Sequence, residues 1–156
     1  MPTDGQRDFD FLIGSWKVRN RRLKRILQGS DEWYEFEATN VAQPVWGGLA
    51  NVDEFDGQMP SGRIQGMTVR LYDPTTQQWR LYWANAARGV LDEPVVGRFE
   101  NGRGEFFNDE VFEGKNIRVR YIWSKITPTS CQWEQAFSPD QGKTWETNWV
   151  MEFTRR

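Results

Sequence analysis

Apolar and polar residues alternate with a period of two along almost the whole chain, in short runs separated by turn residues. This alternation is typical of β-strands with one buried face. Asn101-Gly102, between two such runs, is a strong signal for a two-residue hairpin turn. Residues 8–13 predict one short helical turn or an extended lead-in. The ten predicted strands are residues 14–27, 32–43, 48–56, 62–72, 77–85, 94–100, 103–113, 116–126, 131–138 and 145–155.

Ten sequential strands joined by short turns form an antiparallel meander, whose open edges would invite aggregation. Closing the sheet into a barrel removes these edges. The first and last predicted strands are long and rich in large residues, which favours their pairing across the seam. The sequence therefore predicts an all-β fold, a single-domain antiparallel up-and-down barrel over residues 1–156, wide enough for one small ligand.

Nine tryptophans and no histidine occur in the 156 residues. Without histidine there is no Ser-His-Asp triad, no Cys-His dyad, no His-ligated zinc and no His-held haem. The formal net charge of −2 gives no overall attraction to nucleic acid or to an anionic membrane. The polar start predicts no secretory signal, and no apolar run approaches the ~18 residues of a membrane helix. With one cysteine, Cys131, expected in the core, we expect a cytoplasmic protein without cofactor or metal.

Phe11-Leu12-Ile13-Gly14-Ser15-Trp16 opens the first predicted strand, and Arg155 lies near the end of the last. A Gly-x-Trp start with a terminal arginine to pack on the tryptophan resembles the calycin superfamily of lipocalin-like and fatty-acid-binding-protein-like barrels. Residues 131–138 and 145–155 are also similar to a bacterial lipocalin-like family without assigned activity. The resemblance implies a ligand-binding barrel with Trp16 at its closed end, and it implies no catalytic residue.

Three features found in branches of this superfamily are missing. The chain ends in Phe153-Thr154-Arg155-Arg156, so it lacks the Arg-x-Tyr pair with which intracellular fatty-acid carriers hold a carboxylate. Residues 27–32 form only a turn, where those carriers have a two-helix lid. The haem-binding ten-stranded relatives need a histidine, which this chain does not contain.

Residues 138–145, Ser-Pro-Asp-Gln-Gly-Lys-Thr-Trp, resemble the Asp-box motif. The motif predicts a tight hairpin in which Asp140 binds backbone N–H groups, Gly142 adopts a positive φ and Trp145 packs beneath. In sialidase propellers the motif repeats several times, whereas here it occurs once and no blade repeat is visible. We therefore expect a structural hairpin and no sialidase-like chemistry.

Six basic residues lie between Lys17 and Arg25, which is one possible signature of a nucleic-acid site. The next strand, however, is rich in acidic residues. Folding about Gly29-Ser30 would place Lys24 near Glu35 and Arg22 near Glu37, or one register away. Each such pair stabilises by only ~0.2–1 kcal/mol, but together they neutralise the basic run. This pattern favours a paired hairpin over nucleic-acid binding.

Strand alternation predicts which side chains face the barrel interior, provided that no one-residue bulge inverts it. If Trp16 points inward, the last strand directs Trp145, Thr147, Trp149, Met151, Phe153 and Arg155 inward. The predicted middle layer is Asn20, Tyr121, Gln135, Thr147 and Trp149. The candidate ligand-binding residues are Asn20, Arg22, Arg70, Trp83, Tyr121, Trp133, Gln135 and Trp149.

An aromatic interior with a few polar groups is typical of a small-molecule site, so we expect a small, largely apolar ligand, aromatic ones included. Four alternatives to this interpretation stay open. In the first, the interior is a core filled by side chains. In the second, the barrel is a cofactor-free lyase or isomerase that uses Tyr121 with Arg70 or Glu134, with Arg22 and Glu37 as further candidates. In the third, the outer face, including residues 85–94, binds another protein. In the fourth, the chain forms a homodimer.

Overall fold

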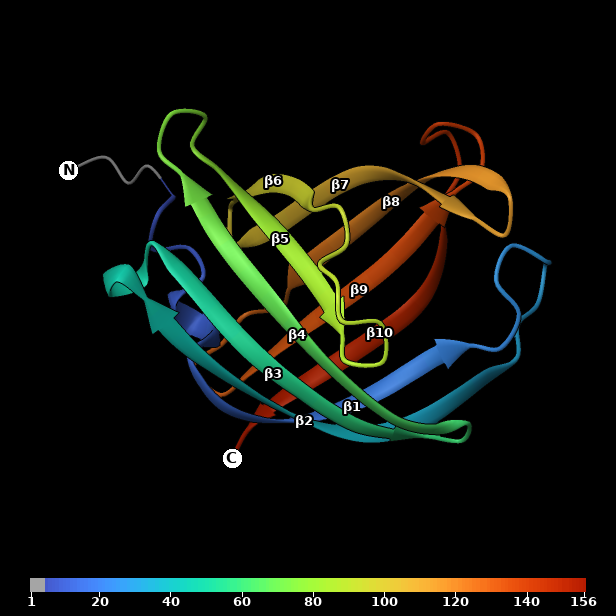
Figure 1. The fold of residues 1–156 in the computed structure, drawn as a ribbon, viewed down its shortest axis with the longest axis horizontal. Helices are drawn as coiled ribbons and strands as arrows, with labels where there is room; N and C mark the ends of the chain where they lie inside the picture. Colours follow the sequence, from blue (N-terminus) through green and yellow to red (C-terminus); the bar gives the residue numbers. More distant parts are fainter. Residues whose placement is uncertain (1–4) are drawn as a thin grey trace.

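The computed structural model describes residues 5–156 and shows a closed barrel of ten antiparallel strands (Figure 1). Each strand pairs with its neighbours in sequence, and β1 pairs with β10 to close the sheet. The strands are β1 (Gly14–Leu23), β2 (Trp33–Val45), β3 (Ala50–Met59), β4 (Gly62–Asp73), β5 (Gln78–Asn85), β6 (Val95–Glu100), β7 (Arg103–Phe112), β8 (Lys115–Ser124), β9 (Ser130–Ser138) and β10 (Glu146–Arg155). The predicted fold class and all ten strands are confirmed.

Two short 3-10 turns complete the secondary structure, η1 (Asp10–Leu12) and η2 (Trp46–Gly48). The predicted helical turn near residues 8–13 is therefore η1, which lies inside one end of the barrel (Figure 1). Phe9, just before η1, is 1% exposed. Its ring makes edge contacts with Trp79, Phe99 and Trp123 at centroid distances of 4.9 to 6.0 Å. The lead-in segment thus closes this end of the barrel with aromatic side chains. Along the described residues, no helix is both long and apolar enough to cross a membrane.

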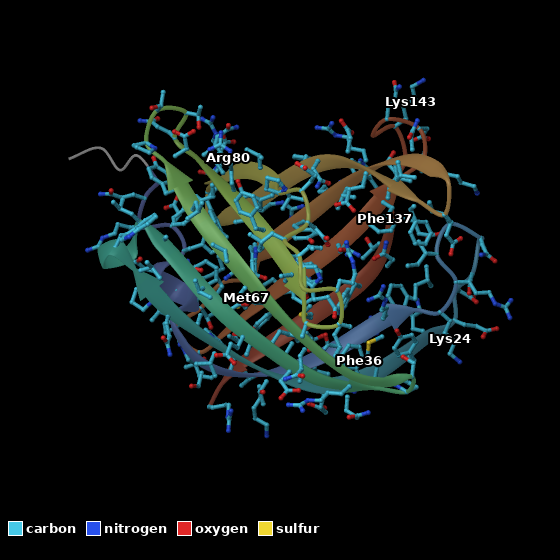
Figure 2. The ribbon with its side chains drawn as sticks, viewed as in Figure 1. Lys24, Phe36, Met67, Arg80, Phe137 and Lys143 are labelled. Carbon is cyan, nitrogen blue, oxygen red and sulfur yellow. The ribbon has the colours of Figure 1, made fainter. Side chains whose placement is uncertain are left out.

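The barrel side chains follow the alternation that the sequence predicts over most strands. Figure 2 shows Phe36 and Phe137 directed toward the interior, whereas Lys24 and Lys143 extend into solvent. Both phenylalanines are at least nine-tenths buried. The buried core therefore lies inside the barrel, with most charged residues outside it.

The connection between β1 and β2 is longer than the sequence predicted. Leu23 lies opposite Trp33, so residues 24–32 form the loop in place of a turn about Gly29-Ser30. The predicted pairs Lys24–Glu35 and Arg22–Glu37 are therefore wrong, since the register differs. The basic run still meets acidic partners on the surface: Arg19 pairs with Glu35 at 2.9 Å and Lys24 with Glu32 at 4.0 Å.

A β-bulge in β10 changes which of its side chains face inward. The register shifts between Thr147 and Trp149, so Asn148 has no opposite residue on β9. Beyond the bulge Trp149, Met151 and Phe153 are buried in the interior, as predicted. Before it Trp145 packs on the Phe107 ring, at a centroid distance of 6.1 Å, and Thr147 lies in the same outer row. The predicted inward positions of Trp145 and Thr147 are wrong because one extra residue inverts the alternation.

The hairpin between β9 and β10 has the structure that the Asp-box motif predicts. Thr144 donates two hydrogen bonds to the Asp140 carboxylate, from its backbone N at 2.9 Å and from its hydroxyl at 2.6 Å. Gly142 has a φ of +90° and lies above Trp145. The hydrogen bonds from Thr144 and Ser138 lower the pKa of Asp140 to about 2. The motif thus stabilises the hairpin, which lies on the outside of the barrel.

Candidate ligand-binding chamber

A cavity of about 80 Å³ lies inside the barrel, between the aromatic closed end and the middle of the sheet. We call it the inner chamber. Its wall is mainly aromatic, and its polar lining comes from strands β2, β3, β4 and β9. The aromatic residues include Trp83, Tyr121, Trp123, Trp133 and Trp149, and the polar residues are Asn40, Asp53, Thr68, Arg70 and Gln135.

A second cavity of about 210 Å³, the outer vestibule, lies next to the inner chamber on the side away from η1. The two cavities share five lining residues, which form the partition between them. The vestibule also has a charged lining, with one arginine and three carboxylates. The shared residues are Leu81, Trp83, Tyr121, Gln135 and Trp149, and the charged ones are Arg22, Asp92, Glu93 and Glu110.

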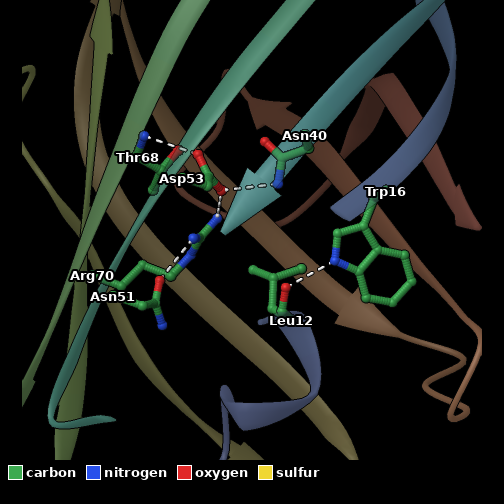
Figure 3. A network of polar contacts seen from close by, with 7 residues as sticks. All are labelled: Leu12, Trp16, Asn40, Asn51, Asp53, Thr68 and Arg70. Atoms are coloured by element: carbon green, nitrogen blue, oxygen red, sulfur yellow. Dashed lines mark hydrogen bonds and ion pairs between the residues drawn. The ribbon is translucent and has the colours of Figure 1, made fainter. Parts of the chain in front are cut away.

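A buried ion pair lies in the wall of the inner chamber (Figure 3). Arg70 Nη2 is 2.8 Å from Asp53 Oδ2, and each side chain is 4% exposed. Arg70 Nη1 also donates to Asn51 Oδ1 at 3.0 Å. The Asp53 carboxylate accepts further hydrogen bonds from Asn40 Nδ2 at 3.3 Å and from the backbone N of Thr68 at 3.1 Å. A buried charge needs such partners because desolvation alone would be costly.

Trp149 is held by polar partners on β1. Its Nε1 donates to Asn20 Oδ1 at 2.9 Å, and the Arg22 guanidinium carbon lies 4.3 Å from its ring centroid. Burial lowers the pKa of Arg22 from its usual value. Trp149 in turn meets Trp133 edge-on, with the ring centroids 5.6 Å apart. Asn20 and Arg22 therefore fix the orientation of one chamber wall.

Two further partition residues have defined surroundings. Gln135 Nε2 donates to Oδ1 of Asn148, the bulge residue, at 2.8 Å. The Tyr121 ring packs edge-on against Trp133 at 5.0 Å. Burial raises the pKa of Tyr121 above its usual value of about 10, so its phenol stays protonated at neutral pH. The bulge therefore also positions a polar group of the chamber wall.

The ring of Trp83 packs closely against β4 at Gly66. A Cβ atom at position 66 would overlap the Trp83 ring, so only glycine leaves room for it there. Trp83 also contacts Phe55 edge-on, with the centroids 6.2 Å apart. The indole therefore packs on Gly66 of β4 while it lines both cavities.

The structure brings most of the predicted site residues to the two cavities. Arg70 and Trp133 line the inner chamber, Arg22 lines the vestibule, and Trp83, Tyr121, Gln135 and Trp149 line both. Within the part of the chain that the structure describes, Asn20 lines neither cavity and acts through Trp149. Sequence reasoning missed Asp53, Asn40 and Thr68. The alternation Asn51-Asp53-Phe55 on β3, with Phe55 apolar, was the available signal for an inward Asp53.

The acidic residues that a lyase or isomerase would need lie elsewhere. Glu37 is exposed on β2, and Glu134 accepts a hydrogen bond from Gln132 at 3.1 Å on the other face of β9 from Trp133 and Gln135. Tyr121 and Arg70 do line the same chamber. Its carboxylate is Asp53, which is already paired with Arg70. Across residues 5–156, no group of three or more acidic, histidine or cysteine side chains is arranged to hold a metal ion.

Comparisons with known proteins give the fold. No family model and no curated protein matches the sequence. Among solved structures, an S-type phycobiliprotein lyase from Guillardia theta is similar with a TM-score of 0.63 and 13% identity, over 99% of this chain and 98% of that one. A redesigned β-barrel has a TM-score of 0.52 and 12% identity, over 96% of both chains. A de novo designed fluorescence-activating β-barrel has a TM-score of 0.52 and 15% identity, over 99% of this chain and 100% of that one.

At these identities the similarity shows the fold alone. A ten-stranded barrel fits a calycin-like fold, and the lyase is a lipocalin-like barrel of this kind. Membership of the calycin superfamily stays a prediction.

Proposed function

We propose that this protein binds one small, largely apolar ligand inside the barrel, with an aromatic ring of the ligand in the inner chamber. The observation that carries the proposal is the chamber itself, an internal space walled by aromatic side chains with few polar groups. Burying apolar ligand surface there contributes roughly 25 cal/mol per Å². Edge-on and offset contacts with the surrounding rings favour a flat, aromatic molecule over a flexible chain.

The size of the chamber limits what it holds. A cavity of about 150 Å³ binds benzene in an engineered protein, and the inner chamber has about 80 Å³. A ring therefore fits only if partition side chains such as Trp83 and Tyr121 shift toward the vestibule. Rotation of these side chains would join the two cavities, so a larger ligand would extend from the chamber into the vestibule.

Two structural neighbours support a ligand inside the barrel. A phycobiliprotein lyase and a designed fluorescence-activating barrel share this fold. Catalysis by a cofactor-free lyase or isomerase is less well supported, because Glu134 lies on the outer face of β9 and burial raises the pKa of Tyr121, which disfavours it as a general base. The cytoplasmic location and the small hydrophobic partner stay predictions from the sequence.

Titration with N-phenyl-1-naphthylamine, an uncharged aromatic fluorophore, tests the proposal. We expect saturable binding to one site per chain, with quenching of tryptophan emission. Met151 lines the chamber, so Met151→Trp should fill it and weaken binding at least ten-fold. Val111 is 68% exposed, so Val111→Trp is the matched control that should leave binding unchanged. Equal binding by the folded Met151→Trp variant, or no saturable binding by the wild type, would overturn the proposal.

A further inference from the structure

Two buried hydrogen-bond donors belong to side chains that line the inner chamber, and both lack acceptors. Among the residues described, Arg70 Nε and Trp123 Nε1 are buried and have no hydrogen-bond partner. Each residue is 3% exposed, and both line the chamber. The Arg70 guanidinium lies 5.5 Å from the Trp123 ring centroid, so the two donors belong to one region of the wall. Folded proteins pair nearly all of their buried polar groups, so two unpaired donors in one cavity call for an acceptor.

We propose, on the basis of the proposed function, that the ligand carries an uncharged acceptor, such as a carbonyl oxygen, which Arg70 and Trp123 bind in the inner chamber. The acceptor would receive hydrogen bonds from Arg70 Nε and Trp123 Nε1. The aromatic part of the ligand would then lie toward Tyr121 and Trp149. The ligand class is a small aromatic or conjugated aldehyde, ketone or amide.

The charge of the chamber explains why the acceptor is neutral. Asp53 already balances the charge of Arg70 at 2.8 Å, and Asn40 and the Thr68 backbone stabilise that carboxylate. A ligand carboxylate would bring a second negative charge, and among the described residues that line the chamber the one cation, Arg70, is already paired. A carbonyl oxygen uses the two free donors and leaves the ion pair intact.

The lining of the vestibule also favours an uncharged ligand. Three carboxylates, Asp92, Glu93 and Glu110, line it beside one cation, Arg22. Asp92 is paired with Arg88 at 2.9 Å, and the two remaining carboxylates outnumber Arg22, so an anionic ligand that enters on this side would meet more negative than positive charge. The lining of the two cavities therefore disfavours carboxylic acids, in agreement with the missing Arg-x-Tyr pair.

Three ligands of nearly equal size test the proposal: acetophenone, isopropylbenzene and benzoate. Acetophenone has the carbonyl oxygen, isopropylbenzene replaces the acetyl group by an apolar one, and benzoate carries a charge. Calorimetric titration should give affinity for acetophenone at least ten-fold above that for either of the others. The indole N–H resonance of Trp123 should move downfield with acetophenone and much less with isopropylbenzene.

The variant Trp123→Phe keeps an aromatic ring and removes the Nε1 donor. It should reduce the preference for acetophenone over isopropylbenzene while isopropylbenzene still binds. Trp145→Phe, on the outer face of the barrel, is the matched control and should leave that ratio unchanged. The Trp123→Phe spectrum also assigns the Trp123 indole resonance, so the test does not depend on affinity alone.

The outcomes separate the two proposals. If acetophenone and isopropylbenzene bind equally well and the Trp123 indole resonance responds equally to both, water serves the two donors and the inference is overturned, while the proposed function stands. Tightest binding of benzoate would also overturn it, in favour of an anion site. If none of the three ligands, nor the naphthylamine, binds to the folded protein, both proposals fail.

Discussion

The guanidinium carbon of Arg155 lies 4.0 Å from the ring centroid of Trp16, although these residues come from the last and the first strand. The two residues are opposite each other in the β1–β10 register. Arg155 also donates to the carbonyl oxygens of Phe11, at 2.7 Å, and Ile13. The Arg155 side chain on β10 therefore contacts both β1 and the segment around η1 that closes this end of the barrel.

Replacing Arg155 should loosen the closed end. Arg155→Ala removes the stacking on Trp16 and the hydrogen bonds to the Phe11, Ile13 and Pro128 carbonyls, so we expect a loss of about 2 kcal/mol in the free energy of unfolding. Arg155→Lys should recover part of this loss, because it keeps the charge without the planar fork. Urea denaturation of the three proteins measures the effect. Equal stability of Arg155→Ala and wild type would show that the stacking contributes nothing.

Gly66→Ala should act on the chamber wall. The added Cβ overlaps the Trp83 ring, so the indole must move toward the chamber or β4 must shift. We expect a destabilisation of about 1–3 kcal/mol, typical of overpacking, together with weaker binding of N-phenyl-1-naphthylamine. The double variant Gly66→Ala, Trp83→Leu should recover stability. If the single variant is as stable as wild type and binds as tightly, the close approach of Trp83 to β4 is not required.

The Asp140 hairpin should open in acid. The pKa of the Asp140 carboxyl is about 2, below the value of about 3.9 for an unfolded aspartate. A depressed folded-state pKa contributes stability that is present above pH 4 and is lost as the pH falls through about 2. The amide resonance of Thr144, whose N–H donates to Asp140, should titrate with a midpoint near 2. Asp140→Asn removes this titration, and a midpoint near 4 in the wild type would contradict the hydrogen-bonded geometry.

Cys131 should be inert in the folded protein. Burial raises the pKa of its thiol to about 12, and the residue is 4% exposed. Since the thiolate is the reactive form, a disulfide reagent at pH 8 should label less than one thiol per chain over hours. Addition of guanidinium chloride should give one thiol per chain at once. Rapid labelling without denaturant would show that the β9–β10 region opens.

The fold was predictable from the sequence because its signals are local. Alternation and turn residues mark each strand, and the Gly-x-Trp start with Arg155 marks the seam. The register of β1 and β2 was not predictable, since the turn signal at Gly29-Ser30 did not show that the loop extends over residues 24–32. The bulge at Asn148 depends on a partner on another strand, Gln135, and therefore leaves no local pattern.

The candidate site was predictable in part for the same reason. Strand alternation placed Trp83, Tyr121 and Trp149 inside the barrel, because aromatic residues at alternate positions mark a buried face. It did not find Asp53, since an isolated carboxylate in a strand is usually on the surface. Its burial depends on Arg70 from the adjacent strand, a pairing that becomes visible only in the register of β3 and β4.

The pairing of β1 with β10 also determines when the barrel can close during folding. The β1–β10 ladder joins residues at opposite ends of the chain, and strand pairs of such large sequence separation form slowly. Trp149, Met151 and Phe153 all lie on β10, so the chamber lacks one wall until that strand docks. On a ribosome the barrel would stay an open sheet until its last strand emerged, and the pocket would form only in the final step of folding.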